Sequence, residues 1–444
     1  MLVMDADAGQ EPVRGEEELA GLVRPDQVSI GVLIRSIPRS VVDDVVAELG
    51  VGALRDDGKL PPPVVAYLVI ALCMFPKLSY QRVIRRVTGA LDWMGCWDAS
   101  WKVPSSSALT QARQRLGPDV MRRVFERIAV PIAGETGPLA RQFASGPARW
   151  AFLGPWRLVS IDGFDLDLPD TGENAAEFGY SGGEQDRSAF PKARVVTLSE
   201  CGTHAFLAAQ VDAWKVSEQE MAGHLYPLLQ GDELLLADRN FYSFEAWNAA
   251  RSGGAQLVWR IKSNLRLPVL KALPDGSYLS GLVDPALRGA RRQKALQALQ
   301  VAASSGQEPD ADPETGFLVR VVEYTIPDRA GNGSGELIAV ITTILDPRQA
   351  SAKDIAAVYH LRWEHETANA EGKTRLNGPA HVLRSRRPDL VRQEIWAWLC
   401  LHYAISVLRT EAAQAAGLDP DRISYTTTID IVRRGAERSA AFPP

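Results

Sequence analysis

Four residues with charged or phenolic side chains recur at helical spacing in the C-terminal part of the sequence. They are Tyr359, Arg362, Glu366 and Lys373. Their offsets of 0, 3, 7 and 14 fall within about 60° of one another on a helix that turns ~100° per residue. One helix face is therefore predicted to carry a carboxylate flanked by two cations and a phenol. A charge pair at this spacing is usually a solvated salt-bridge face, which does not explain the tyrosine.

Two aspartates follow short apolar runs that are typical of buried strands. Asp162 follows residues 157–161, and Asp238 follows residues 233–237. A carboxylate in this position lies at the carboxyl edge of a sheet, where open α/β sheets build their sites. Either aspartate alone could equally begin a turn or cap a helix. Three other aspartates alternate with leucine or lie nearby, as on a solvent-facing strand edge, and are weaker candidates than Asp162: Asp165, Asp167 and Asp170.

Two kinds of chain organisation position these residues. Residues 30–132 have helical periodicity, with a proline run at 61–63, a serine N-cap at 105–107 and a helix stop at Gly117-Pro118. From about Trp150 the pattern changes to β-β-β-α-β-α-β, which predicts a mixed sheet covered by helices. A hairpin is predicted around Cys201-Gly202-Thr203. Residues 354–373 and 393–409 are predicted to be helices.

Composition excludes several classes of protein. Apolar residues make up 46% and charged residues 23% of the 444 residues, which is typical of a chain with a buried core. The four cysteines are scattered, so neither a disulfide framework nor a zinc site is predicted. The longest apolar run, residues 64–75, is too short to span a bilayer. We expect no membrane association and a cytoplasmic protein.

The net charge of −5 hides a marked asymmetry. Residues 1–60 carry 12 acidic and 6 basic side chains, whereas residues 61–150 carry 12 basic and 5 acidic ones. A bound phosphate responds to the local electrostatic potential rather than to the net charge of the whole chain. The basic block therefore suits nucleic-acid binding, although a solvated helical surface would also explain it.

The Tyr-x-x-Arg-x-x-x-Glu-x-x-x-x-x-x-Lys spacing resembles the Y-R-E-K signature of the insertion-element-4 family of bacterial transposases. Residues 160–163 are similar to that family's first aspartate segment, and residues 235–243 are similar to its second. The helical block, including residues 105–117, is similar to its N-terminal domain. The resemblance covers about residues 30–410. It implies an α/β fold with a ribonuclease-H-like mixed sheet and helices, a β-rich insertion before the last catalytic helix, and an all-α N-terminal domain.

The resemblance also implies a metal site and its chemistry. Asp162, Asp238 and Glu366 would be the catalytic residues and metal ligands for two Mg²⁺ or Mn²⁺ ions. Hard cations of this kind take oxygen ligands, and two of them activate the attacking hydroxyl and stabilise the leaving oxygen in phosphodiester cleavage. No H-E-x-x-H spacing is present that would indicate a zinc hydrolase.

Residues that would hold DNA follow from the same resemblance. Arg362 and Lys373 would contact phosphates near the cut, and Tyr359 would contact the backbone or a flipped base. Arg239 either pairs with Asp238 or contacts the scissile strand, and His365 is expected to be structural. On the helical block, five arginines would contact the terminal inverted repeats: Arg82, Arg85, Arg86, Arg113 and Arg115. A second basic cluster at residues 384–392 either holds the DNA flank or is a solvated loop. Three aromatic residues are candidates for stacking on a flipped base, although core packing is their commoner role: Trp259, Tyr278 and Trp363.

The function implied is cut-and-paste DNA transposition. The protein would act as a homodimer on double-stranded transposon ends and target DNA, and it would lie on the nucleoid when bound to DNA. Two alternatives stay open: a domesticated DNA-binding protein that no longer cuts, and a metal-dependent nuclease. The expected organisation is an acidic flexible tail (1–29), a helical DNA-end-binding domain (30–149), a catalytic core in two parts (150–264 and 351–410), a β-rich insertion (265–350) and a C-terminal tail (411–444).

Overall fold

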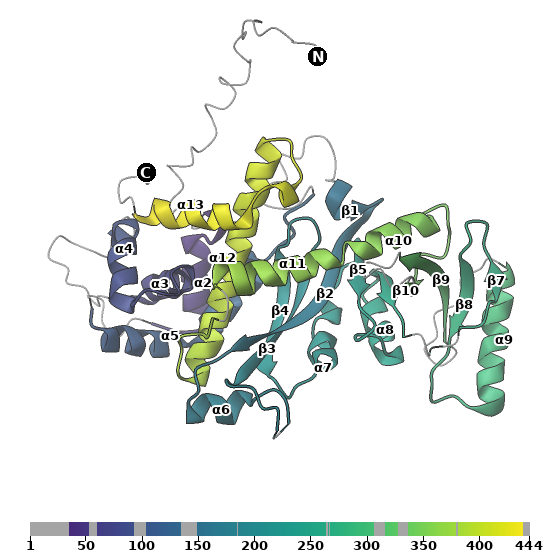
Figure 1. Cartoon of the computed structure of the whole chain (residues 1–444), viewed down its shortest axis with the longest axis horizontal. Helices are drawn as coiled ribbons and strands as arrows, with labels where there is room; N and C mark the ends of the chain where they lie inside the picture. The colour runs from purple at the N-terminus through teal and green to yellow at the C-terminus, as the bar shows by residue number, and fades with distance from the viewer. Residues whose placement is uncertain are drawn as a thin grey trace, which may run out of the picture.

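The structure is a computed structural model. It describes residues 35–52, 60–92, 104–134, 149–183, 185–262, 265, 267–305, 316–326, 336–378 and 381–437. The expected acidic tail and Cys96 lie outside these ranges. Figure 1 shows a helical end on the left and a long sheet that extends to the right.

The N-terminal part is helical, as the sequence predicts. Its helices are α2 (Arg39–Glu48), α3 (Pro62–Met74), α4 (Tyr80–Asp92) and α5 (Ser106–Ile128). Helix α3 begins at a proline, whose fixed φ suits the first helical turn, and Ser105 caps α5 by accepting a hydrogen bond from the backbone N–H of Ala108. Gly117, with φ of 72°, and Pro118 bend α5 at the predicted helix stop.

The central sheet has the topology expected of a ribonuclease-H-like domain. Strands β2 (Trp156–Asp167), β3 (Lys192–Glu200) and β4 (Phe206–Ala213) form an antiparallel meander. Strands β5 (Glu233–Ala237) and β6 (Gln256–Arg260) then follow β2 in parallel. The predicted hairpin lies between β3 and β4. The two-residue β1 (Phe152–Leu153) pairs with β2 and follows the short turn η2 (Arg149–Ala151).

The β-rich insertion continues this sheet rather than forming a separate one. Strand β10 (Glu336–Thr342) pairs with β6, and β9 (Phe317–Ile326), β8 (Tyr278–Leu282) and β7 (Lys271–Ala272) follow in antiparallel order. Helix α9 (Gly289–Ser305), which the sequence analysis does not predict, packs on β8 through Leu299 and Ala303 at the right end of Figure 1.

Helices cover both faces of the sheet. One face carries α7 (Glu218–Gly223), η3 (Tyr226–Leu228) and α8 (Phe244–Arg251), whose apolar side chains form one core with β5 and β6. The other carries α10 (Ala352–His360), α11 (Trp363–Ala370) and α12 (Pro388–Ala415), while α6 (Gly172–Phe178) lies beside α12. Figure 1 shows α10 and α11 crossing in front of the strands.

Helix α12 joins the two halves of the molecule. Its buried side chains, Trp396, Trp398 and Leu401 among them, belong to a single hydrophobic cluster that also contains side chains of α3, α5, β3 and β4. The helical block is therefore packed on the sheet through a continuous core. Among the described residues, no helix is both long and apolar enough to cross a membrane.

The last part of the chain is helical. Beyond α12 the chain forms the short turn η5 (Pro420–Arg422) and helix α13 (Tyr425–Glu437). Tyr425, Ile429 and Val432 are buried in the shared core. The prediction of a C-terminal tail from residue 411 is therefore wrong for residues 411–437, because an apolar stripe at helical spacing finds a partner surface there.

The helix predicted at residues 354–373 is interrupted twice. Between α10 and α11 the backbone bonds of residues 361, 362, 364 and 365 run to the residue three positions earlier, which tightens the turn. After α11 the chain widens into a π-helical segment, η4 (Glu371–Leu376). The residues of the signature therefore do not share one straight helix face.

Candidate active site

Neighbouring parallel strands bring Asp162 and Asp238 to the same level of the sheet. Ile161 of β2 pairs in register with Ala237 of β5, so the two aspartates are the next residue along each strand. Strand β5 ends at Ala237, whereas β2 continues to Asp167. The prediction that the first strand ends at Asp162 is wrong, because residues 162–167 remain paired with β3. The edge formed by the end of β5 nevertheless holds both carboxylates.

Glu366 reaches this edge from α11, and its neighbour His365 fixes that helix to the sheet. The His365 ring is 1% exposed, with Nδ1 2.8 Å from the Ser160 hydroxyl and Nε2 2.9 Å from the Thr197 hydroxyl. Thr197 is the cross-strand partner of Asp162. Burial, reinforced by the charge of Arg362, lowers the pKa of His365 to about 3, so the ring is neutral.

Arg362 lies among the three acidic residues. Its guanidinium is 7% exposed, and Nη2 lies 3.2 Å from Oε1 of Glu366. Burial opposes its charge, but the Tyr359 hydroxyl, Asp238, Asp162 and Glu366 together raise the pKa of Arg362. Three carboxylates that are far apart in the sequence thus act electrostatically on one buried cation.

The pKa of the Asp162 carboxyl group is strongly affected by its surroundings. Burial raises its pKa to about 6, against the lowering effects of the Gly163 backbone N–H and of Arg362. The side-chain amide of Asn369 donates to Oδ2 of Asp162 at 3.4 Å. Asn369 was not predicted from the sequence, although its position three residues after Glu366 places both on one helix face.

The neighbouring aspartates have other partners. Asp165 forms an ion pair with Arg194 at 3.2 Å, and Asp167 forms one with Lys192 at 2.6 Å, both across the β2–β3 pair. The Tyr180 hydroxyl donates to Asp170 at 2.7 Å. These contacts agree with the choice of Asp162 over its neighbours as the candidate.

Tyr359 is buried and does not present its ring to solvent. It is 3% exposed and packs in the cluster formed by Leu158, Leu236 and Val340, on the α10 side of the sheet. Its hydroxyl has no hydrogen-bond partner among the described residues, and burial raises its pKa well above the usual range. Helix α10 turns this side chain into the core, so the predicted contact of Tyr359 with DNA finds no support in its position.

Arg113 is likewise buried, which contradicts its predicted role in DNA contact. Its side chain is 0% exposed and donates to Gln393 at 2.9 Å, to Ser385 at 3.0 Å and to the backbone oxygen of Leu390 at 3.2 Å. Arg113 therefore joins α5 to α12. Its neighbour two residues on, Arg115, is exposed.

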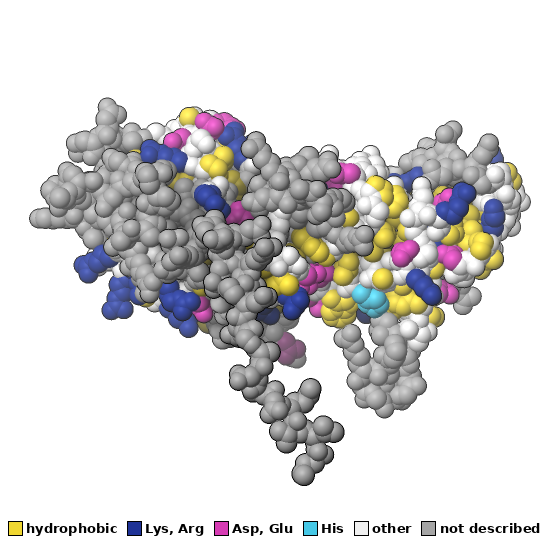
Figure 2. Space-filling view, turned by 90° about the horizontal axis from the view of Figure 1, so that it is seen from above, with side chains coloured by type: hydrophobic (Ala, Val, Ile, Leu, Met, Phe, Trp, Pro, Cys, Tyr) yellow, Lys and Arg dark blue, Asp and Glu magenta, His cyan; other side chains and the backbone are white. Residues whose placement is uncertain are grey.

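Several cations of the candidate set remain exposed. Lys373 and Arg239 are exposed and form no ion pair with any residue that the structure describes, so Arg239 does not pair with Asp238. On α4, Arg82 and Arg85 are also exposed. Figure 2 shows Lys and Arg side chains along the edge of the end that carries the helical block.

The second basic cluster is largely occupied by contacts within the protein. Arg384 donates to the backbone oxygens of Leu78, Phe75 and Pro76 at the end of α3. Arg392 forms an ion pair with Glu177 at 2.7 Å, and Arg387 lies 3.3 Å from Asp389. This pattern favours a structural interpretation of residues 384–392.

The three aromatic candidates for stacking differ in exposure. Trp259 is fully buried against Trp247 and Tyr226. The Tyr278 hydroxyl donates to Glu323 at 3.0 Å. Trp363 is 54% exposed at the start of α11, three residues before Glu366. Trp363 is thus the most exposed of the three, and the guanidinium of Arg362 lies over its ring, 5.3 Å from the centroid.

The acidic residues do not form a closed metal cage. Across the described ranges, no three His, Cys, Asp or Glu side chains lie close enough together to enclose an ion. Glu366 is 45% exposed and turned toward Arg362. The donor set consists of carboxylate oxygens, which suits a hard divalent cation.

Comparison with known proteins agrees with this geometry. Residues 155–404 match the family described as "Transposase DDE domain", and residues 27–126 match "Insertion element 4 transposase N-terminal". The chain belongs to the insertion-element-4 family of DDE transposases. The matched ranges include all three acidic residues and both basic helices, α4 and α5.

Relatives of this transposase family extend over most of the chain. The transposase InsG for insertion sequence element IS4 of Escherichia coli (strain K12) is 25% identical over 397 residues, covering 89% of this chain and 80% of InsG. InsZ of the same strain is 27% identical over 178 residues, covering 40% of this chain and 54% of InsZ. Among solved structures, a piggyBac transposase synaptic complex with hairpin DNA matches 93% of this chain and 80% of that chain, with 9% identity and a TM-score of 0.43.

Proposed function

We propose that this transposase binds the terminal inverted repeats of an insertion sequence and moves it by cut-and-paste transposition. Asp162, Asp238 and Glu366 are its catalytic residues. The observation that carries the proposal is the convergence of these three carboxylates, from two parallel strands and one helix, on the buried Arg362.

The metal ligands proposed are the same three carboxylates, for two Mg²⁺ or Mn²⁺ ions. The partly buried Asp162 fits such a role because its raised pKa reflects a cost of charging that the Gly163 N–H and Arg362 offset only in part. A nearby divalent cation would offset the rest. When bound, two such ions generate the nucleophile and stabilise the leaving oxygen in phosphodiester cleavage. Because Glu366 already pairs with Arg362, its carboxylate must rotate or be shared to complete the ligand set.

The basic residues of the site hold the DNA backbone. Arg239 directly follows Asp238, and Lys373 lies in η4, directly after the helix that carries Glu366. Both are exposed cations, and we propose that each contacts a phosphate oxygen. Arg362 holds Glu366 in place and neutralises part of the acidic charge that would repel DNA. Tyr359, buried beneath Arg362, supports that side chain rather than the nucleic acid.

Recognition of the element's ends belongs to the helical block. Exposed arginines on α4 and α5 include Arg82, Arg85 and Arg115, and phosphate contacts of this kind give binding that weakens steeply with salt. Trp363 is the residue proposed to stack on a flipped base.

Joining two ends together requires two catalytic centres, so the active species is proposed to be a homodimer on double-stranded DNA. The protein is proposed to be cytoplasmic and to lie on the nucleoid when bound.

The test uses the purified protein with Mg²⁺ or Mn²⁺ and a duplex from the DNA that flanks its coding region. Cut-and-paste transposition predicts cleavage at the repeat ends and products in which the freed 3′ ends are joined to a second duplex. Cleavage without joining would indicate a nuclease, and binding without cleavage would indicate a domesticated DNA-binding protein. Equal cleavage of a duplex with shuffled sequence would contradict end recognition.

A further inference from the structure

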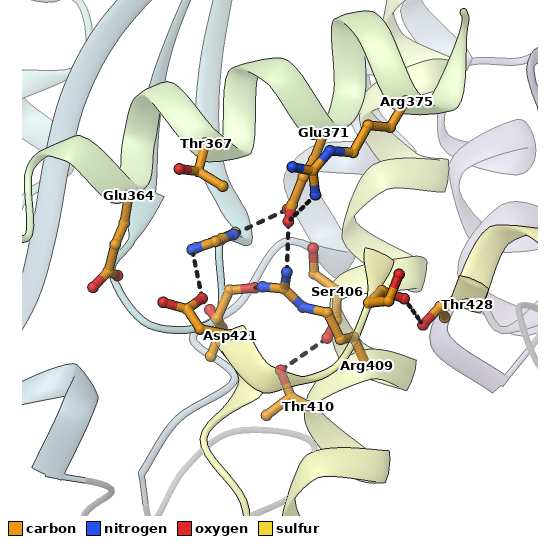
Figure 3. A network of polar contacts seen from close by, with 12 residues as sticks. Glu364, Thr367, Glu371, Arg375, Ser406, Arg409, Thr410, Asp421 and Thr428 are labelled. Atoms are coloured by element: carbon orange, nitrogen blue, oxygen red, sulfur yellow. Dashed lines mark hydrogen bonds and ion pairs between the residues drawn. The ribbon is translucent and has the colours of Figure 1, made fainter. Parts of the chain in front are cut away.

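A buried cluster of charged side chains lies beyond the catalytic carboxylates, at the start of the π-helical segment. Glu371 is 2% exposed and accepts hydrogen bonds from Nη1 of Arg409 at 2.7 Å and from Nδ1 of His204 at 3.0 Å. These partners come from α12 and from the turn between β3 and β4. Figure 3 shows Glu371 pointing from its helix toward Arg409, with a dashed line between the two side chains.

The imidazole of His204 lies between two carboxylates. Nε2 lies 3.1 Å from Oδ1 of Asp421 on η5, opposite the contact of Nδ1 with Glu371. Glu371 forms a hydrogen bond with Nδ1, whereas Nε2 lies within ion-pair distance of Asp421 without forming a hydrogen bond. Both carboxylates favour a positive charge on the ring. Although burial opposes this charge, Asp421 and Glu371 raise the pKa of His204. Its backbone has φ of 60°, and Arg409 Nη2 donates to the neighbouring Thr203 carbonyl at 3.0 Å.

The backbone that follows Glu371 is held just as firmly. Gly372 packs so closely on Trp398 that a Cβ at this position would overlap the indole ring. At the other end of η4, the Leu376 carbonyl accepts a hydrogen bond from Arg433 of α13 at 2.7 Å. Lys373, between these anchors, is exposed and has no partner among the described residues.

We propose that the cluster of His204, Glu371, Arg409 and Asp421 positions Lys373 for its contact with DNA. The cluster fixes residues 371 and 372 against α12, so that Lys373 leaves the π-helical turn in one direction. The inference rests on the proposed function, in which Lys373 holds a phosphate. It adds four positioning residues, and it makes η5 and α13, beyond the last predicted element, part of the active-site scaffold.

The charged and titratable groups that face His204 come from every element packed around it. They are Glu364, His365 and Glu371 from α11 and η4, His402 and Arg409 from α12, and Asp421 at η5. Behind them, Arg375 pairs with Glu371, and Asp419 acts on Glu364. Of these, only Glu371 and Asp421 contact the imidazole as ion-pair partners. Replacing Asp421 therefore removes one of the two charges that hold His204 protonated.

The test measures the affinity for a duplex from the DNA flanking the coding region as a function of salt. Asp421→Asn removes the negative charge beside His204 at a side chain that is 48% exposed, so the fold should be retained. Asp419→Asn is the matched control, because it removes the same charge from the same turn while its oxygen can still accept from the Asp421 N–H. Glu371→Gln is a second, stronger test of the same cluster.

Lys373→Ala should lower the slope of log K against log salt by about 0.9, as expected for one lost phosphate contact. Asp421→Asn should weaken binding about 3- to 10-fold and lower the slope in the same way, with no further loss when combined with Lys373→Ala. Glu371→Gln should do the same to a greater extent, and Asp419→Asn should bind as the wild type does.

Two results would overturn the inference without touching the proposed function. One is normal binding by both Asp421→Asn and Glu371→Gln while Lys373→Ala binds weakly. The other is a loss from Asp421→Asn that multiplies with that of Lys373→Ala, which would indicate a role independent of the lysine. Normal binding by Lys373→Ala would instead overturn the proposed phosphate contact itself, and the positioning role with it.

Discussion

His365 and Ser160 are joined by a 2.8 Å hydrogen bond that ties the helix carrying Glu366 to the strand carrying Asp162. The second nitrogen of the same ring lies 2.9 Å from Thr197 on the next strand. The distance between two of the proposed metal ligands is therefore set by a neutral, buried imidazole rather than by contact between the carboxylates.

Replacing His365 with leucine should destabilise the protein and slow cleavage. The change keeps the apolar contacts but leaves the buried hydroxyls of Ser160 and Thr197 without their partner, which costs roughly 3 kcal/mol. Urea unfolding followed by circular dichroism measures the free energy of unfolding. His360→Leu, at an exposed position of α10, is the control and should change stability by less than about 0.5 kcal/mol. Equal stability of the two variants would contradict the anchoring role.

Arg113 and Arg115 should respond to substitution in opposite ways. Arg113→Ala removes hydrogen bonds that link α5 to α12 and should lower the free energy of unfolding by roughly 3 kcal/mol. Arg115→Ala should leave stability nearly unchanged. It should lower the slope of log K for DNA binding against log salt by about 1, as expected for the loss of one phosphate contact. Thermal unfolding and binding titrations separate the two effects. A stable Arg113→Ala that binds DNA weakly would restore Arg113 as a DNA contact.

Gly372→Ala should disturb the π-helical segment. The added Cβ meets the ring of Trp398, and relieving this overlap costs about 1–3 kcal/mol. Gly223, near the end of α7, has open space at the same atom, so Gly223→Ala should be neutral or stabilising. Unfolding midpoints in urea compare the two variants directly. If Gly372→Ala were as stable as the wild type, the packing on Trp398 would not constrain the segment.

Stability should depend on pH through the His204 cluster. The pKa of His204 is raised on folding, so its contribution is fully present below about pH 6.5 and is lost as pH rises through the higher folded value. The pKa values of Glu371 and Asp421 are lowered, so their contribution is present above about pH 4 and is lost as pH falls through the lower folded values. The wild type should therefore exceed Asp421→Asn in stability most clearly near pH 6.

The difference in stability between the wild type and Asp421→Asn should shrink as pH rises toward 9. Glu364, whose pKa burial raises to about 7, adds repulsion to Asp421 as it ionises and acts in the same direction. Urea unfolding of both proteins between pH 5 and 9 measures the difference in their free energies of unfolding. Groups that titrate in the same way in both proteins cancel in this difference. A difference that stays constant over this range would mean that His204 is not charged in the folded state.

The sequence predicts the parts of the site that depend on local pattern. The ends of two apolar runs locate Asp162 and Asp238, although only β5 ends there and β2 continues to Asp167. Helical offsets link Arg362 to Glu366, which do form an ion pair. The same offsets fail for Tyr359 and Lys373, because a tightened turn and a π-helical segment change the phase of the helix between them.

Tertiary packing decides what the sequence could not show. Arg113 and Arg115 are equally basic and two residues apart, yet α12 covers only the first. His204 and Asp421 are separated by more than 200 positions, and neither stands in a recognisable motif. Helix α13 was missed because its apolar stripe is short and its partner surface, on α4, α12 and η4, is assembled from distant segments.

The most direct test of the central claim compares the wild type with three single variants, Asp162→Ala, Asp238→Ala and Glu366→Ala. Each is assayed with Mg²⁺ or Mn²⁺ for strand cleavage of a duplex carrying the element's own ends, and for binding of that duplex without metal. The account predicts that all three variants lose cleavage by at least a factor of about 10³, as for groups on which the chemical step depends, while they still bind the duplex. Metal-dependent cleavage that persists in all three variants would contradict it.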